Sequence, residues 1–296
     1  MRNTKILLLL VLPVILMAQG KSTGSAFLQT VLPARISAMG DALAADPSSS
    51  SSSFSNPASL VWAKTPEVTF SQIQWIQDMQ TQILSASVPL PLGTVGLSIS
   101  STSVEGIEIR DIPGTAIGTF ASRSSVFRLG YAFSLSKEIS VGTNLKYLYE
   151  KIYIDDASGY ALDFGGLYNT PISGLTLGLA ITNVGQVSKF RTQSSELPTA
   201  AKVGGTYVTT VSDFEIVGAL TIEHESNSAI TRFHFGTEAT YDHMFSIRLG
   251  YQTHYDIRGL TAGLGFRYSI AVVDYAYLPF TQDFGSAHIV TLGIEL

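Results

Sequence analysis

Cysteine is absent from the 296-residue chain, and charged residues are scarce. Without cysteine the protein can form neither a disulfide nor a thiolate metal site, and it cannot carry a lipid on an N-terminal cysteine. Only 14% of the residues are Asp, Glu, Lys or Arg, against about 25% in a typical soluble domain. The net charge of -5 includes no block of like charge. The composition therefore argues against a nucleic-acid partner.

Long apolar runs are missing too, with one exception at the N-terminus. There "MRNTK" supplies two positive charges, "ILLLLVLPVILM" is an apolar run of 12 residues interrupted by Pro13, and "AQG" offers a small-x-small site. A membrane-spanning helix needs roughly 20 apolar residues. The layout therefore predicts a secretory signal peptide over residues 1–20, cleaved after Ala18 or Gly20.

From Pro66 onward, apolar and polar residues alternate with the two-residue period of a β-strand. In "GLTAGLGFRYSI", for example, Leu260, Leu264 and Phe266 share one face. Short turn-forming segments such as "PLPLG", "DDASG" and "NTPISG" separate the alternating stretches. The pattern predicts about fourteen strands, at 67–76, 80–90, 93–103, 119–135, 138–151, 159–169, 174–183, 199–209, 213–224, 229–241, 244–255, 258–269, 270–279 and 286–295.

Two all-β architectures are compatible with this alternation, a soluble sandwich and a membrane barrel. Strands of about 10 residues are what a tilted membrane-spanning strand requires, whereas strands in soluble proteins average about 5–6 residues. Tyrosines near strand ends, including Tyr168, Tyr255 and Tyr268, suit the aromatic girdles of such barrels. With the export signal, these features predict an all-β transmembrane antiparallel β-barrel over residues 65–296, located in the outer membrane.

In a barrel, the polar face of each strand lines the lumen, because charges turned toward lipid are very costly. The candidates for lumen-lining polar residues are Arg232, His234, Glu238, Arg248, His254, Arg267 and Asp274. A lumen lined largely by such residues reads slightly against a wide hydrophobic conduit.

Residues 21–64 do not alternate, and they contain six consecutive serines at 48–53. A serine run often marks a linker, but too few residues lie between the signal peptide and Ser48 to form a domain with its own core. A linker between two domains is therefore disfavoured for the serine run. Arg35 is expected to pair with a lumen carboxylate, and the alternative is a solvated surface arginine.

Within this segment, "PARISAMGDALAAD" followed by "NPASL" resembles the N-terminal signature of the PorV/PorQ family of outer-membrane barrels, which are similar to the FadL fatty-acid transporters. Further along, "LAITNVGQVSKF", "LPTAAKVGGTY", "VDYAYLPF" and "GSAHIVTLGIEL" extend the resemblance over nearly the whole mature chain. The resemblance implies a plug over residues 21–64 that fills the barrel, with the serines as a loop inside a wet lumen and the motif carried by Arg35, Gly40, Ala42, Asn56, Pro57, Ala58 and Leu60. Two departures are the serine run and Leu296 at the C-terminus, where many such barrels end in phenylalanine.

The sequence contains no recognisable catalytic motif. The five histidines are scattered, neither "HExxH" nor "GxSxG" occurs, and the serine, histidine and glutamates of "IEHES" around His224 lie on opposite faces of a strand. We therefore expect neither an enzyme nor a cofactor or metal site. Residues 105–120 do not alternate clearly, and they are read either as a greasy outer loop that docks a ligand or partner or as a hairpin extension.

Two functions remain open. Similarity to FadL implies transport of hydrophobic molecules across the outer membrane through a plugged barrel. Similarity to PorV and PorQ implies a non-transporting accessory, shuttle or scaffold role in type IX protein secretion. The expected partners are outer-membrane lipid and either a hydrophobic small molecule or secreted and secretion-system proteins.

Overall fold

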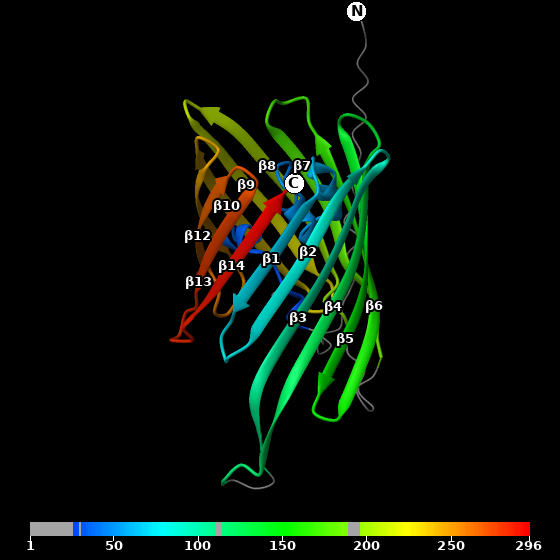
Figure 1. Cartoon of the computed structure of the whole chain (residues 1–296), viewed down its shortest axis with the longest axis vertical. Coiled ribbons are helices and arrows are strands. Elements are labelled where there is room, and N and C mark those ends of the chain that lie inside the picture. The colour runs from blue at the N-terminus through cyan, green and yellow to red at the C-terminus, as the bar shows by residue number, and fades with distance from the viewer. Residues whose placement is uncertain (1–25, 30, 111–113, 189–195) are drawn as a thin grey trace, which may run out of the picture.

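The structure, a computed structural model, describes residues 26–29, 31–110, 114–188 and 196–296. Within these ranges the chain forms a closed antiparallel barrel of fourteen strands (Figure 1). The strands are β1 (Glu67–Gln74), β2 (Gln80–Leu90), β3 (Gly93–Ile109), β4 (Gly118–Ser134), β5 (Ile139–Ile152), β6 (Asp155–Asn169), β7 (Leu175–Val187), β8 (Ala200–Val211), β9 (Phe214–Glu225), β10 (Ile230–Tyr241), β11 (Phe245–Gln252), β12 (Leu260–Tyr268), β13 (Ala271–Pro279) and β14 (Ser286–Glu295). The predicted fold class and strand number are confirmed. The predicted signal peptide lies outside the described residues.

Each strand pairs with its neighbours in the sequence, and β1 pairs with β14 to close the sheet from Glu67↔Glu295 to Gln74↔His288. Closure leaves no open edge, so each strand finds its backbone partners inside the wall. The β2–β3 ladder runs without interruption from Leu90↔Gly93 to Gln80↔Ser103. Register shifts occur between Val104 and Ile107 on β3 and between Leu162 and Phe164 on β6.

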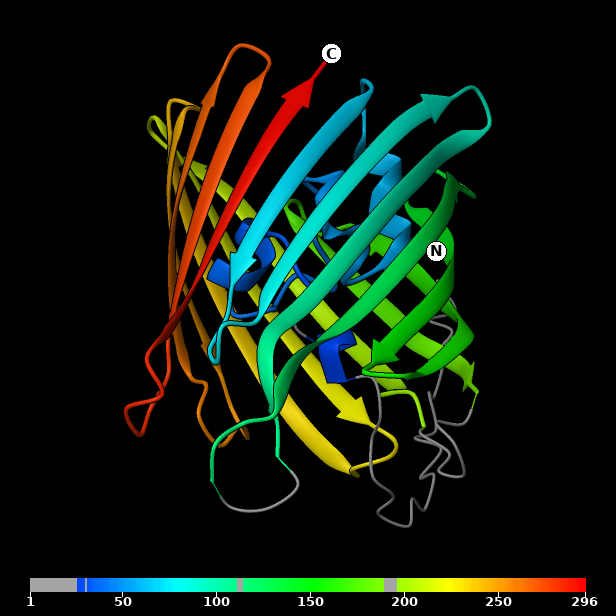
Figure 2. The same cartoon turned by 60° about the horizontal axis from the view of Figure 1, so that its bottom comes forward.

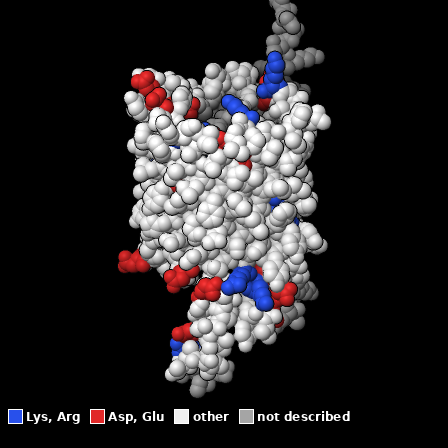
Figure 3. Space-filling model, in the orientation of Figure 1, with Lys and Arg blue, Asp and Glu red and all other residues white. Residues whose placement is uncertain are grey.

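The period-two alternation separates an apolar outer surface from the lumen. On β11, Phe245, Ile247, Leu249 and Tyr251 are exposed, whereas Arg248 and Gln252 are buried. Figure 3 shows one side of the molecule, on which most charged residues gather toward the two ends and a broad band between them is nearly free of charge. A band of this kind is what the hydrocarbon core of a bilayer requires.

The two ends of the barrel differ in their connections. At the end where β14 terminates, the connections are short, at 91–92, 135–138, 170–174, 212–213, 242–244 and 269–270. At the opposite end they include the longer segments 110–117, 188–199, 253–259 and 280–285. We call these the turn end and the loop end. In bacterial barrels the short turns face the periplasm and the longer loops face the outside.

The largest difference from the predicted strands is in the β3–β4 hairpin. β3 runs to Ile109, beyond the predicted end at residue 103, and Ile107↔Phe120 and Ile109↔Gly118 are paired across it. The hairpin projects past the neighbouring strands at the loop end (Figures 1 and 2). Residues 105–109 and 118–120 are therefore a hairpin extension, as one of the two readings of this segment expected.

Among the described residues, no helix has the length and apolar character needed to cross a membrane.

Candidate functional site

The described residues before β1, 26–29 and 31–66, lie inside the barrel (Figure 2). They form four short helices, η1 (Ala26–Gln29), α1 (Ala34–Ala38), η2 (Ser50–Phe54) and η3 (Pro57–Trp62). We call residues 31–64 the plug. α1 packs against β11 to β14, and η3 packs against β3 to β6, so the plug crosses the lumen from one wall to the other. Ala34, Ile36, Ala38, Met39, Ala42 and Leu43 are fully buried, which indicates that the plug is a packed core and not a loose tail.

Asn56 fixes η3 to the barrel wall. Its side-chain oxygen caps η3 by accepting from the Ala58 backbone N–H at 3.1 Å. Its Nδ2 donates to the Ala44 carbonyl at 2.7 Å and lies 3.2 Å from the Gly166 carbonyl and 3.3 Å from the Leu179 carbonyl. Pro57 follows at the first helical position, where its missing N–H costs nothing. The two residues therefore act as a wedge between β6 and β7 and the rest of the plug.

A belt of lumen-facing glycines makes room for the plug. A Cβ at Gly142 would lie 2.6 Å from the Pro57 carbonyl, and one at Gly130 would lie 2.7 Å from Leu60. The belt consists of Gly96, Gly130, Gly142, Gly165, Gly178, Gly204, Gly236, Gly250 and Gly263, and at each of them a Cβ would come within 3.1 Å of a plug atom. The sequence analysis missed this belt. The sequence does carry a signal for the belt, because in nine strands one of these glycines occupies a position that faces the lumen.

Arg35, which was predicted to pair with a lumen carboxylate, lies buried at the centre of a charged network. Its Nε and Nη2 each lie 3.1 Å from one oxygen of Glu238 on β10, and its Nη1 lies 2.5 Å from Asp46 of the plug. Arg248 on β11 also contacts Glu238 and lies 2.6 Å from Asp274 on β13. Three of the predicted lumen residues, Glu238, Arg248 and Asp274, thus belong to this network, and Glu238 is the one that contacts Arg35. Paired donors of this kind satisfy carboxylates well.

Two further clusters lie on the wall, one on β5 and β6 and one on β9 and β10. Lys146 on β5 lies 2.8 Å from Asp163 on β6, and Asp163 accepts from the Asn183 backbone N–H at 2.8 Å. Asn183 has a φ of 60° at the interruption of the β6–β7 ladder, which turns its amide toward that carboxylate. Arg232, another predicted lumen residue, lies 2.8 Å from Glu225. Gln29 of η1 donates to the same carboxylate at 3.1 Å.

The remaining motif residues of the plug make close backbone contacts. Gly40 has a φ of 62°, and a Cβ there would lie 2.8 Å from the backbone of Phe235 and of Tyr251, so neither conformation nor space admits a side chain. Its carbonyl lies 2.9 Å from Nδ1 of His234, which must be the donor. The carbonyl of the fully buried Ala42 accepts from the Thr221 hydroxyl at 2.8 Å.

Asp41 predicts a pH dependence of plug stability. Its carboxylate is buried and accepts from Gln252 at 2.7 Å, and burial raises the pKa of Asp41 above its ordinary value of 3.8. Because its pKa is raised, protonation of Asp41 favours the folded state. Its contribution to the free energy of unfolding is complete below the ordinary pKa and is lost as pH rises through the raised pKa. The other charged or titratable groups that act on this carboxyl are His234, Arg258, Lys202 and Glu223.

We therefore expect Asp41→Asn to raise the thermal midpoint at neutral pH and to leave it unchanged in acid. Asparagine keeps an acceptor for Gln252 and tolerates the left-handed φ of 61° at this position. The control is Asp78→Asn, because Asp78 has a φ of 56° but is exposed. Thermal midpoints measured from acidic to neutral pH test this, and parallel pH profiles of Asp41→Asn and the unmodified protein would contradict it.

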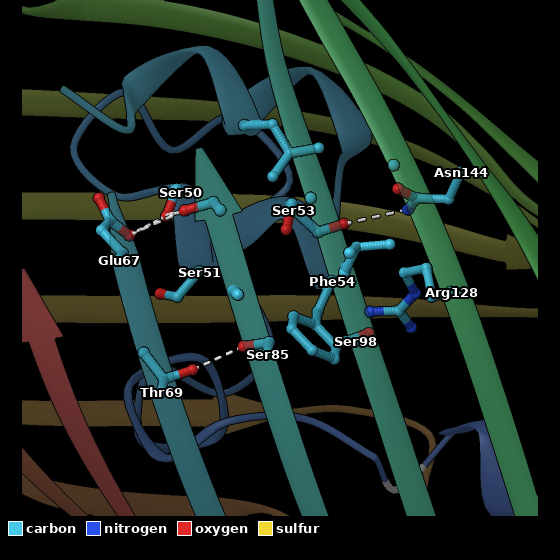
Figure 4. A pocket seen from close by; sticks show the side chains of 16 residues that line it. Ser50, Ser51, Ser53, Phe54, Glu67, Thr69, Ser85, Ser98, Arg128 and Asn144 are labelled. Carbon is cyan, nitrogen blue, oxygen red and sulfur yellow. Dashed lines mark hydrogen bonds between the residues drawn. The ribbon is translucent and has the colours of Figure 1, made fainter. Parts of the chain in front are cut away.

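The serine run faces the turn-end half of the lumen and is folded. Ser50 contacts Glu67 at the start of β1, while the hydroxyl of Ser48 lies 2.6 Å from Asp46 and that of Ser52 lies 2.5 Å from it. The run borders a cavity of about 190 Å³ on the Arg35 side and one of about 30 Å³ on the β1–β5 side (Figure 4). Both cavities touch Ser51, Glu67 and Thr69. Arg267, predicted to line the lumen, is exposed at the rim of the larger cavity and lies 3.1 Å from Glu295.

Part of the loop-end half of the lumen is apolar, along β1, β2, β4 to β6, β13 and β14, whereas the side formed by β9 to β11 carries buried Glu225, Arg232, His234 and Gln252. We call the former part the apolar patch. Two buried clusters meet there, and Phe27 of η1 packs against both. The lumen-facing side chains come from the loop-end halves of seven strands, namely Ile73, Ile83, Val126, Leu148, Ala161, Leu278 and Ile289. Leu197 and Phe280 join them from the connecting segments. Barrel interiors are generally polar, so this apolar patch is unusual in a lumen whose other buried side chains are largely polar, as the sequence predicted.

Arginines and aromatic rings stack at the loop-end mouth. The guanidinium of Arg258 lies 4.2 Å from the ring centroid of Tyr255 and 5.5 Å from that of Trp75. Tyr255 was predicted to belong to a lipid-facing girdle, but it also stacks on Arg232 at 4.6 Å. The prediction that His254 lines the lumen is wrong. β11 ends at Gln252, and His254 follows with a φ of 58° and an exposed side chain, because the turn breaks the alternation.

Within the described residues, no group of three or more histidine, aspartate or glutamate side chains is arranged to hold a metal ion.

No protein-family model matches the sequence, and no curated protein matches it either. Solved structures share the fold. The toluene transporter TbuX of Ralstonia pickettii is 12% identical, with a TM-score of 0.58 over 90% of this chain and 98% of that one. The toluene transporter TodX of Pseudomonas putida is 12% identical, with a TM-score of 0.60 over 93% and 98%. A FadL homologue of Pseudomonas aeruginosa is 12% identical, with a TM-score of 0.52 over 88% and 97%.

Proposed function

We propose that the protein is an outer-membrane channel for uptake of hydrophobic small molecules. The observation that carries the proposal is the apolar patch in the loop-end half of the lumen. A hydrophobic solute gains free energy when it leaves water for such a surface, at about 25 cal/mol for each Å² of apolar area buried. The fold is shared with two toluene transporters and a FadL homologue, and this similarity supports the same function.

In this proposal the two halves of the lumen do different work. The loop end faces the outside and collects the solute among side chains such as Ile83 and Leu148. The plug then blocks the way, because its charged network and its glycine-lined contacts fill the middle of the barrel. The β2–β3 ladder is continuous and leaves no opening through the wall between these two strands. The proposed route therefore leads past the plug and along the serine run toward the periplasm.

A charge placed in the apolar patch tests the proposal. We expect Ile83→Glu to lower the uptake rate of a hydrophobic solute by about tenfold or more, because even 1.4 kcal/mol of lost affinity is tenfold and burying an unpaired carboxylate costs more. The control is Gln80→Glu, which adds the same charge at an exposed position of the same strand. Uptake of radiolabelled toluene and of a long-chain fatty acid would be measured in a host that lacks its own hydrophobic channels.

If the folded unmodified protein takes up neither solute, the proposal fails. The PorV/PorQ membership and the role in type IX secretion stay predictions of the sequence resemblance, and no observation among the described residues favours that role.

A further inference from the structure

Arg128 stands out among the charged residues of the lumen. It lies on the lumen face of β4, and its guanidinium carbon is 4.1 Å from the ring centroid of Phe54 in the plug. Its Nε and Nη1 are buried and have no hydrogen-bond partner among the described residues. Buried N–H groups are almost always hydrogen-bonded, and buried charges are almost always paired. Stacking on Phe54 satisfies neither requirement.

The charges around Arg128 do not balance. Arg128 pairs in register with Lys146 on β5, so two cations lie side by side. The carboxylate that acts on both is Asp163, and its Oδ1 lies 2.8 Å from Lys146. On the far side of the lumen, by contrast, Arg35 and Arg248 share three carboxylates, Asp46, Glu238 and Asp274. Asp163 is thus engaged by Lys146, and among the described residues no carboxylate forms an ion pair with Arg128.

A cavity is available beside the unpaired guanidinium (Figure 4). Its volume of about 30 Å³ is room for about two water-sized groups, since one needs about 10–15 Å³. Serine hydroxyls line it from the plug and from the wall, and each can donate a hydrogen bond. The carboxylate that also lines the cavity, Glu67, is on the opposite side and is engaged by Ser50 and Ser87.

We propose that Arg128 and the surrounding serines hold a small monovalent anion, of chloride size, between the plug and the barrel wall. The anion accepts from Arg128 and from hydroxyls such as those of Ser53 and Ser98, which also line the cavity. A water beside it donates to Oδ1 of Asn144, which is buried and has no partner. Because the ligands come from both η2 and the wall, the anion fastens the plug. The site stands independently of the transported solute.

Water alone is the competing occupant. Two waters would satisfy the N–H groups but would leave the excess positive charge uncompensated in a buried site. Anomalous diffraction separates the two, because bromide scatters anomalously and water does not. Crystals of the full-length protein in bromide are expected to show an anomalous peak within hydrogen-bond distance of Arg128. A peak that is absent there, or a water-like density without anomalous signal, overturns the proposal.

A variant series tests the assignment in solution. In a chloride titration at constant ionic strength, with gluconate as the replacement anion, we expect the thermal midpoint of the unmodified protein to rise by about 2 °C or more. Arg128→Gln should abolish this rise and the bromide peak, and Arg128→Lys should keep both if it retains the charge. The matched control Arg123→Gln removes an exposed arginine of the same strand, 3.4 Å from Glu105, and should leave both unchanged.

Acetate tests the size of the site. It carries the same charge in a larger molecule, so it should not displace bromide. Displacement by acetate overturns the assignment of a chloride-sized ion, and equal responses of Arg128→Gln and Arg123→Gln overturn the role of Arg128. If Arg128→Gln does not fold, the bromide peak in the unmodified protein and the Arg128→Lys response still decide the question.

Discussion

Gly165→Val is expected to release the plug from its seat while the barrel stays folded. A Cβ at Gly165 would lie 1.9 Å from Oδ1 of Asn56 and 2.8 Å from Pro57, and both contacted residues belong to the start of η3. The new side chain cannot fit unless Asn56 moves, and that movement breaks the bonds from Asn56 to Ala44 and to the Ala58 N–H. Overpacking and the lost bonds together should cost about 3 kcal/mol of plug docking.

Limited proteolysis of the plug and leakage of a small solute from proteoliposomes measure this release. The matched control is Gly166→Val. Gly166 is the next residue on β6 but faces outward, and a Cβ there would meet nothing closer than the Ser140 carbonyl at 3.8 Å. If the two variants are cleaved and leak at the same rate, η3 does not hold the plug in the way described. A barrel that loses its heat-modifiable fold in both variants would also contradict the expectation.

Glu238→Gln should be the most destabilising conservative change in the charged network. Glu238 is the carboxylate that joins the plug to the wall, because Arg35 and Arg248 both bind it and all three side chains are nearly fully buried. Glutamine has the same shape but no charge, so two buried arginines lose their shared partner. Breaking a buried ion pair by removing one member costs about 3–5 kcal/mol. We therefore expect a loss of this size in the free energy of unfolding, measured by urea titration.

The matched control is Glu105→Gln, which removes the partner of Arg123 at 3.4 Å in an exposed pair. Exposed pairs contribute about 0–1 kcal/mol, and salt screens them. High salt should therefore erase the effect of Glu105→Gln and leave that of Glu238→Gln nearly unchanged. A small or salt-sensitive effect at Glu238 would show that water reaches the network.

Three contacts hold the plug in the barrel. The hydrogen bonds of Asn56 and the Arg35–Glu238 ion pair are visible in the structure, and the anion at Arg128 is inferred. All three contacts lie in the turn-end or central part of the lumen, whereas the apolar patch lies toward the loops. Opening a path for a solute would then require rearrangement at the plug and not in the outer half.

The sequence by itself determined the wall of the barrel. A period of two residues is a local property, and in a membrane it leaves one possible orientation, with the apolar face of strands such as β11 toward lipid. The number of strands, their order and most of their boundaries follow from that pattern and from the turns. The hairpin end at Ile109 and the turn at His254 did not follow, because there the alternation fades or breaks in short irregular segments.

Only the tertiary structure decided what fills the barrel. Which carboxylate meets Arg35 depends on residues 203 positions apart in the chain, and no local pattern encodes that distance. The same holds for the glycine belt, since a glycine in a strand shows its purpose only when Asn56 or Leu60 is seen against it. Alternation tells which side chains face inward but not how deep they lie. The apolar patch among the polar lumen residues therefore became visible only when the strands were placed in register.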